Sequence, residues 1–278
     1  MRTHLWKKID GAGANHEGSN STNTPTDVTN SPIEADNNNA RCENGTECST
    51  AAEDVLADSE SYYNNAKKYW SNVSPTVDGM LGGFGSISFI DIRGSEQFLK
   101  FLYKQKPAPG RKRALDCGAG IGRISKNLLL PLFEQVDLVE QDEHFCQTAR
   151  TELADFGSKL GTVFNAGLQD FVPEPGRYDI IWAQWVLGHL TDEDTVRFLE
   201  RCTNALTRGG MIVMKENFTT GDVVDVDRTD SSVTRPLVQM KQLLKQANMR
   251  VVKEQRQTSF PKELYPVYML ALRPTVKK

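Results

Sequence analysis

Long apolar runs are missing from this sequence of 278 residues. No stretch approaches the roughly 18–20 apolar residues of a membrane helix, so we expect no membrane-spanning segment. The five cysteines are odd in number and scattered, without a CxxC pair, which indicates a reducing compartment and argues against a zinc site. The first residues lack the apolar core of a signal peptide, so we expect a cytoplasmic protein. The net charge of −3 gives no reason to expect nucleic-acid binding.

Aromatic residues are nearly absent from residues 1–58, where Trp6 is the only one. This segment is crowded with Asn, Ser, Thr and Gly, and it carries four basic against ten acidic residues, a net charge of −6. Such a composition cannot bury enough apolar surface to offset the entropy lost on ordering the chain. We therefore predict a disordered, acidic and polar tail. It is either passive or has a targeting or docking role seeded by Arg2, Lys7 and Lys8.

Residues 59–278, about 220 in number, have the size of one α/β domain. Helix-like and strand-like segments alternate along most of this region, which is typical of a mainly parallel sheet with helices on both faces. The helix-like segments are 59–70, 96–104, 123–133, 145–156, 192–206 and 238–247. The strand-like segments are 114–117, 136–140, 162–165, 179–182, 211–215, 250–255 and 265–272.

The first strand-to-helix turn, Asp116–Gly122, is rich in glycine. Glycines at such a turn allow a ligand to approach the backbone closely. Glu140 ends the next strand, where a carboxylate can bind both hydroxyls of a ribose. Both dinucleotides and S-adenosylmethionine use this geometry. Arg123 stands where the dinucleotide motif has its last small residue, and it can pair with the α-carboxylate of S-adenosylmethionine. The combination favours a methyltransferase over a dinucleotide enzyme or a turn that serves packing alone.

Longer motifs carry a resemblance to the protein α-N-terminal methyltransferases. The similar segments are Leu115–Ile124, Gly167–Phe171, Tyr178–Asp192 and Asp230–Arg235, together with the substrate-side loop Pro75–Gly83. The resemblance implies a Rossmann-like, class I methyltransferase fold that uses S-adenosylmethionine, releases S-adenosylhomocysteine and needs no metal. It further implies methylation, up to three times, of the free α-amino group of proteins that begin Xaa-Pro-Lys or Xaa-Pro-Arg after Met removal. By the same resemblance we expect the protein in the nucleus as well as the cytoplasm.

The resemblance implies a set of cofactor-binding residues. They are Gly118, Gly120 and Arg123 in the turn, Glu140 at the ribose, Leu168 and Gln169 beside the adenine, and Gln184 at the methionine portion. The family often has a different triplet where this chain reads Glu-Gln-Asp from Glu140 onward. The acid is kept, so we expect ribose binding to survive, whereas Gln141 and Asp142 depart from the pattern.

The resemblance also implies the groups that handle the substrate. Those that shape the peptide channel are Tyr69, Trp70, Leu81, Ile87, Trp185, Asn217, Asp227, Ser232 and Tyr265. An amine must be neutral to accept a methyl group, yet an α-amino group has a pKa near 7.7–8.0 and is mostly protonated at pH 7. Asp230 and His189 are expected to accept its proton, directly or through water, and Asn217 to hold the first peptide carbonyl. The basic Arg228 departs from the family pattern, so Asp227 is the weaker assignment.

Two other functions share parts of this pattern. A small-molecule amine methyltransferase would need the cofactor half of the motifs but not the block Asp230-Ser-Ser or a peptide-sized channel. A catalytically silent protein-binding module would not need every cofactor and base position to be filled, as they are here. A purely structural interpretation of Asp230 is that it caps a helix before Val233.

Overall fold

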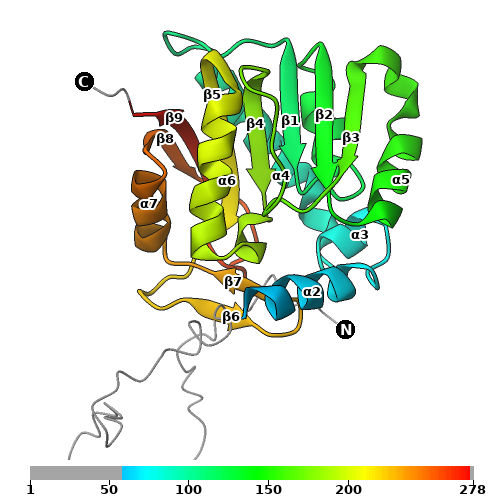
Figure 1. Cartoon of the computed structure of the whole chain (residues 1–278), viewed down its shortest axis with the longest axis vertical. Coiled ribbons are helices and arrows are strands. Elements are labelled where there is room, and N and C mark those ends of the chain that lie inside the picture. The colour runs from blue at the N-terminus through cyan, green and yellow to red at the C-terminus, as the bar shows by residue number, and fades with distance from the viewer. Residues whose placement is uncertain (1–57, 276–278) are drawn as a thin grey trace, which may run out of the picture.

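The computed structural model describes residues 58–275 (Figure 1). A seven-stranded sheet with the order β3-β2-β1-β4-β5-β9-β8 forms its centre. Strands β1 to β5 pair in parallel, and β9 runs antiparallel to both β5 and β8. The strands are β1 Arg113–Cys117, β2 Gln135–Glu140, β3 Leu160–Asn165, β4 Tyr178–Gln184, β5 Leu206–Asn217, β8 Met249–Arg256 and β9 Val267–Pro274. The predicted mainly parallel sheet is confirmed.

Helices cover both faces of the sheet, as the sequence predicts. Successive side chains of a strand point to opposite faces, and β4 shows the result: Ile181 packs in one apolar core and Ile180 in the other. The first core contains side chains from α6 and α7, the second from α4 and α5. The helices are α2 Ser59–Trp70, α3 Val77–Met80, α4 Ser88–Leu102, α5 Glu143–Glu152, α6 Asp192–Ala205 and α7 Leu237–Gln246.

Two helical segments differ from the prediction. Helix α4 begins at Ser88, before the predicted start at Glu96. The prediction missed its first turns because Gly94 lies inside the helix, where glycine is unfavourable. A Cβ on Gly94 would lie 2.2 Å from the Gln257 side chain, so the close packing of that side chain excludes a better helix former. Of the helix expected over 123–133, residues 123–129 are helical, with π-helical geometry at Ser125–Leu129, and a turn follows.

A small hairpin of β6 (Asp225–Asp227) and β7 (Ser232–Thr234) lies outside the main sheet. In Figure 1 it lies beside α2, beyond the carboxyl ends of β1, β2 and β4. Ser232 and Val233 thus belong to a strand, and the interpretation of Asp230 as a helix cap is wrong. Three-residue strands carry too little alternation to be recognised in a sequence.

The prediction of a disordered tail lies outside the described residues, apart from Asp58. The Asp58 side chain caps α2 by accepting the Ser61 N–H at 3.1 Å. Within residues 58–275, no helix is both long and apolar enough to cross a bilayer. The same residues contain no group of three or more His, Cys, Asp or Glu side chains arranged to hold a metal ion.

Candidate active site

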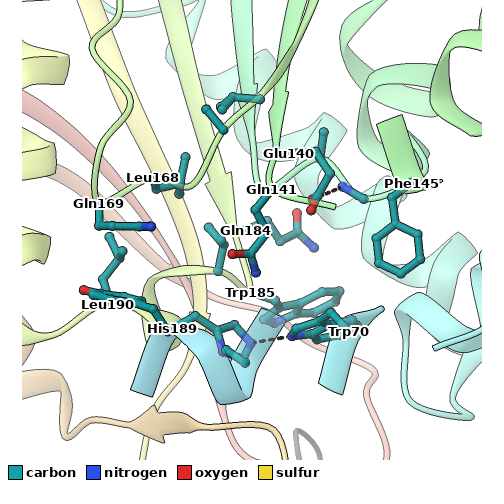
Figure 2. Close-up of a pocket in the computed structure, with 18 of the residues that line it drawn as sticks. Trp70, Glu140, Gln141, Phe145, Leu168, Gln169, Gln184, Trp185, His189 and Leu190 are labelled. Atoms are coloured by element: carbon teal, nitrogen blue, oxygen red, sulfur yellow. Dashed lines mark hydrogen bonds between the residues drawn. The ribbon is translucent and has the colours of Figure 1, made fainter. Parts of the chain in front are cut away.

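A pocket opens where the parallel strands end, roofed by α2 (Figure 2). It contains about 860 Å³ of space free of protein atoms, part of it open to solvent. Ligands of open α/β sheets bind at this edge. The lining residues most relevant to chemistry are Trp70, Gly118, Gly120, Glu140, Gln141, Phe145, Leu168, Gln169, Gln184, Trp185 and His189.

The glycine turn forms one wall of the pocket. Gly118 has φ +65°, a conformation that side chains disfavour, and a Cβ there would lie 2.4 Å from Val186. The amides of Gly118 and Ala119 both donate to the Val139 carbonyl, at 2.9 and 3.1 Å. The turn is thereby tied to the end of β2, and its missing side chains leave the space for a ligand.

The Glu140 carboxylate is oriented by two backbone N–H groups, one bonded to each of its oxygens. Its Oε2 accepts the Gly120 N–H at 2.9 Å and its Oε1 accepts the Asp142 N–H at 2.9 Å. Burial raises the pKa of this carboxyl, and the two amide donors oppose that shift. A fixed carboxylate beside the glycine turn fits the two ribose hydroxyls of a nucleoside cofactor. Gln141 lines the pocket, and Asp142 caps α5 by accepting the Phe145 N–H.

The predicted adenine end is supported from α6. Leu168 and Gln169 line the pocket, and their carbonyls accept from Arg201 Nη2 at 2.8 and 3.0 Å. Arg201 Nε also donates to the Phe171 carbonyl at 2.9 Å. Arg201 was not predicted from the sequence, because it holds a loop that lies 30 or more residues before it.

The predicted methionine end centres on a buried carboxylate, Asp91 of α4. Gln184 lines the pocket, and its Nε2 donates to both Asp91 oxygens at 2.9 and 3.0 Å. Arg123 Nη1 pairs with Asp91 Oδ2 at 2.7 Å, and its guanidinium lies 5.5 Å from the centre of the Trp185 ring. Arg123, predicted to bind the cofactor, is thus not among the residues that line the pocket; it lies beside Trp185, which does line it, and already has a carboxylate partner in Asp91.

Trp185 follows β4 in a left-handed backbone conformation, with φ +54°. Such a conformation is strained for a non-glycine residue, and strain of this kind concentrates at functional sites. Glu216 stabilises the turn, because its Oε1 accepts the N–H groups of Val186 and Leu187, both at 3.0 Å. Burial raises the pKa of Glu216 to about 7. Glu216 was not predicted from the sequence, since it contacts the turn and not the pocket.

His189 has partners on both ring nitrogens. Trp70 Nε1 of α2 donates to Nε2 at 3.1 Å, as Figure 2 shows, so Nε2 carries no proton. Nδ1 lies 3.1 Å from the Ser231 carbonyl and must be the protonated nitrogen, because a carbonyl oxygen can only accept. Ser231 also has a left-handed backbone, with φ +52°. These two bonds join α2, the His189 turn and the hairpin into one wall.

Asp230 is buried in the turn that connects the two strands of that hairpin. Its Oδ1 accepts the Ser232 hydroxyl at 2.6 Å, whereas its Oδ2 has no hydrogen-bond partner among the described residues. Burial raises the pKa of Asp230, and the neighbouring His189 opposes that shift. Asp227 is similar: Oδ1 accepts the Thr229 N–H at 2.8 Å, and Oδ2 has no partner in the described part of the chain.

The other predicted channel residues are not among those that line the pocket, and two of them pack with Trp185. Leu81 and Ile87 are buried with Leu264 and Val267, and Trp185 packs against this cluster. Asn217 is buried at the last position of β5. The Tyr69 ring packs edge-on against the Trp70 ring, with their centres 5.4 Å apart. The Tyr265 hydroxyl donates to Asp225 in the hairpin.

Comparison with known proteins identifies the family. Residues 58–273 match the family model described as AdoMet dependent proline di-methyltransferase. The human N-terminal Xaa-Pro-Lys N-methyltransferase 1 is 48% identical over 221 residues, 79% of this chain and 99% of the relative. The alpha N-terminal protein methyltransferase 1 of Drosophila melanogaster is 49% identical over 227 residues, 81% of this chain and 80% of the relative.

Solved structures agree on the fold. A SAM-dependent methyltransferase from Leishmania major has a TM-score of 0.73 at 42% identity, over 78% of this chain and 86% of that chain. A phosphoethanolamine N-methyltransferase from Haemonchus contortus shares the fold, with a TM-score of 0.59 at 17% identity, over 82% of this chain and 51% of that one. The predicted class I fold and the S-adenosylmethionine cofactor are confirmed. The chain is a member of the AdoMet-dependent proline di-methyltransferase family.

Proposed function

We propose that the chain methylates the free α-amino group of proteins that begin Xaa-Pro-Lys or Xaa-Pro-Arg. The observation that carries this proposal is the buried Asp230 Oδ2, which has no hydrogen-bond partner among the described residues. A buried carboxylate oxygen is costly without a donor, and a substrate ammonium group supplies one. The name of the human relative points to Xaa-Pro-Lys N-termini, and the name of the Drosophila relative points to protein α-N-termini.

The pocket fits S-adenosylmethionine. Its sulfonium group would supply the methyl group, and the sulfur would leave as a neutral thioether. We assign the ribose to Glu140, the adenine to Leu168 and Gln169, and the methionine portion to Gln184 and Arg123, through the α-carboxylate. The glycines of the turn make room for the ligand, because side chains at Gly118 or Gly120 would collide with Val186 or Met80. This set of contacts would hold the sulfonium end toward Trp185.

Proton removal is the task of the substrate side. Asp230 takes a proton from the substrate ammonium, which leaves a neutral amine whose lone pair attacks the methyl carbon. Each transfer leaves a methylated ammonium and a protonated Asp230. Asp230 releases that proton to solvent, and the regenerated carboxylate then accepts the proton of the methylated ammonium before a further transfer. His189 contributes to proton removal only after Trp70 withdraws its N–H from Nε2, because both ring nitrogens are otherwise engaged.

Peptide selectivity follows from the shape and charge of the hairpin side. Proline in second place restricts the chain end to extended conformations, which lowers the entropy lost on binding in a narrow channel. Trp185 offers an aromatic face for the ring. The partly unpaired carboxylate of Asp227, with the Ser232 hydroxyl beside Asp230, suits a lysine or arginine side chain in third place.

The test is mass spectrometry with isotope-labelled cofactor. We expect methylation of an Xaa-Pro-Lys peptide at its α-amino group and none of its N-acetylated form, because an amide nitrogen has no available lone pair. Small amines should be inert, which separates this function from a small-molecule methyltransferase. Changing the third-position lysine to glutamate should nearly abolish binding, and Asp227→Lys should weaken Xaa-Pro-Lys more than Xaa-Pro-Gln peptides. Methylation of the acetylated peptide on its lysine side chain would refute the proposal.

A further inference from the structure

Three ionised side chains meet behind the methionine end of the pocket, and we call them the charge cluster: Asp91, Arg123 and Lys215. Asp91 Oδ2 lies 2.7 Å from Arg123 Nη1, and Asp91 Oδ1 lies 2.5 Å from Lys215 Nζ. The members come from α4, the glycine turn and β5, so the fold assembles them from distant parts of the sequence.

Lys215 is the member whose presence needs an explanation. Its side chain is 0% exposed, whereas that of Arg123 is 5% exposed, so Lys215 is not positioned to contact a ligand. Lysine is almost never fully buried unless it is paired, and an apolar side chain in such a place is often as stable or more so. Here Nζ also donates to Ser95 Oγ at 3.0 Å and to Gln257 Oε1 at 2.8 Å. The buried positive charge of Lys215 therefore has one ion-pair partner, Asp91, and further hydrogen-bond acceptors.

The charge balance suggests a reason. Burial disfavours ionisation of Asp91, yet Lys215 and Arg123 together hold the pKa of Asp91 below its ordinary value. With all three groups ionised, the cluster has one more positive than negative charge. An Arg123–Asp91 pair alone would be neutral and would attract an anion weakly. The positive charge of Lys215 offsets the negative charge of Asp91. The positive charge of Arg123 therefore has no counter-charge within the cluster.

We infer that Lys215 is a positioning residue that keeps the site of the cofactor α-carboxylate cationic by neutralising Asp91 from behind. Asp91 in turn holds the Gln184 amide and the Arg123 guanidinium in fixed orientations, and Lys215 allows it to do so without cancelling the charge of Arg123. The inference rests on the proposed placement of that carboxylate at Arg123.

Other acidic groups near Arg123 do not change this balance between variants. Asp116 accepts from the Ser125 amide and hydroxyl at 3.0 and 2.7 Å, and burial raises its pKa to about 6. Glu140 is fixed by the Gly120 and Asp142 amides. Both stay the same when Lys215 or Asp91 is replaced, so they contribute equally to every comparison.

The test measures the affinity of two ligands by calorimetry. They are S-adenosylhomocysteine and S-adenosyl-3-thiopropylamine, its analogue without the carboxylate. For Lys215→Met we expect about tenfold weaker binding of S-adenosylhomocysteine, with binding of the analogue unchanged or tighter. In the double variant Asp91→Asn/Lys215→Met, Arg123 again has an uncompensated charge. Its affinity for S-adenosylhomocysteine should return to within about threefold of the unaltered protein.

Asp137→Asn is the matched control. Asp137 is 0% exposed and paired with Arg113 and Arg177, but it lies near the beginning of β2, away from the pocket. This variant should lower the melting temperature without changing the preference between the two ligands. If Lys215→Met weakens both ligands equally, or if the double variant binds as weakly as the single one, the inference is wrong.

Two further results keep the test decisive. If Lys215→Met does not fold, the double variant must still prefer S-adenosylhomocysteine as the unaltered protein does, and a lost preference would overturn the inference. Arg123→Ala tests the underlying placement separately, because it should abolish that preference. A preference that survives Arg123→Ala but falls in Lys215→Met would locate the carboxylate elsewhere and leave the charge effect of Lys215 standing.

Discussion

The two halves of the active site treat their buried carboxylates differently. In the cofactor half, Glu140 accepts two backbone amides, and Asp91 pairs with Arg123, Lys215 and the Gln184 amide. In the substrate half, Asp227 and Asp230 each keep one buried oxygen without a hydrogen-bond partner in the described part of the chain. The first half is complete in its polar contacts before any ligand binds, whereas the second is not.

This difference indicates that the two halves have different roles. Satisfied carboxylates orient other groups, because moving them would break several bonds at once. A carboxylate with an unpaired buried oxygen gains most when a ligand donates to it, so it suits proton transfer and cation binding. In the cofactor half the left-handed positions of the turn are glycines, such as Gly118 and Gly120, whereas the non-glycine residues Trp185 and Ser231 adopt this conformation beside the substrate half.

Replacing Asp230 should have the largest effect. Asp230→Asn keeps the shape of the side chain but cannot accept a proton, so we expect the rate to fall by about 10²–10⁴. The measurement is the rate–pH curve at saturating cofactor and peptide. Asp227→Asn, in the same hairpin, is the control and should weaken Xaa-Pro-Lys binding while leaving the saturated rate nearly intact. An unchanged rate–pH curve for Asp230→Asn would show that this carboxylate takes no part in proton transfer. The proposed difference between the two halves would then be wrong.

Glu216 should make stability depend on pH. Because burial raises its pKa from an ordinary 4.5 to about 7, the folded state holds the proton more tightly than the unfolded state. This contribution to stability is complete below about pH 4.5 and is lost as the pH rises through about 7. In Glu216→Gln that loss, up to about 3 kcal/mol, should disappear. Urea unfolding at pH 5 and pH 8 measures it, and equal pH dependence in both proteins would contradict the prediction.

The tether between α2 and His189 should have a smaller effect. Trp70→Phe keeps an aromatic ring but removes the N–H that donates to His189 Nε2, a loss of about 0.5–1.5 kcal/mol. We expect cofactor binding, measured by calorimetry, to weaken about threefold to tenfold. Tyr62→Phe removes a second bond from α2, to the Gly188 carbonyl at 2.6 Å, and is the control. If Trp70→Phe alters the saturated rate and Tyr62→Phe does not, His189 takes part in the chemistry of the substrate half.

Removing the N-terminal segment should have the smallest effect. A chain that begins at Ala57 retains Asp58, the cap of α2, and both halves of the pocket. We therefore expect it to fold and to turn over a short Xaa-Pro-Lys peptide at nearly the full rate. Circular dichroism and the methylation assay check this. A large loss of turnover with the fold intact would mean that the preceding residues contribute to the substrate half.

The sequence predicts the parallel sheet and the ligand-facing residues well, because each leaves a local pattern. The glycine turn is compact, and Glu140 follows it at the end of the next strand. The block from Asp230 to Ser232 was identified as functional by resemblance, although its strand was not. Whether these residues act as assigned stays a prediction.

Supporting residues could not be found in this way. Asp91 and Lys215 are separated by 124 positions, and Glu216 and Val186 by 30, so no short motif contains both partners. Nothing in the local sequence distinguishes Arg201 from an exposed basic residue of a helix. Their roles come from tertiary packing, which a single sequence does not show. Glu216 in particular looks like an ordinary acid beside Asn217 until β5 aligns it with the turn after β4.

The left-handed backbone of Trp185 has a consequence for engineering. This conformation costs an aromatic residue roughly 1–2 kcal/mol relative to glycine, which adopts it freely. Glycine at this position would relieve the strain, but it would also remove the ring that faces the pocket and packs against the apolar cluster around Leu81. Loss of a packed aromatic ring typically costs about 3–5 kcal/mol, so the packing of the ring outweighs the strain of the turn. Libraries aimed at a more robust enzyme should keep Trp185 fixed and seek their gains in the distant sheet edge around β8.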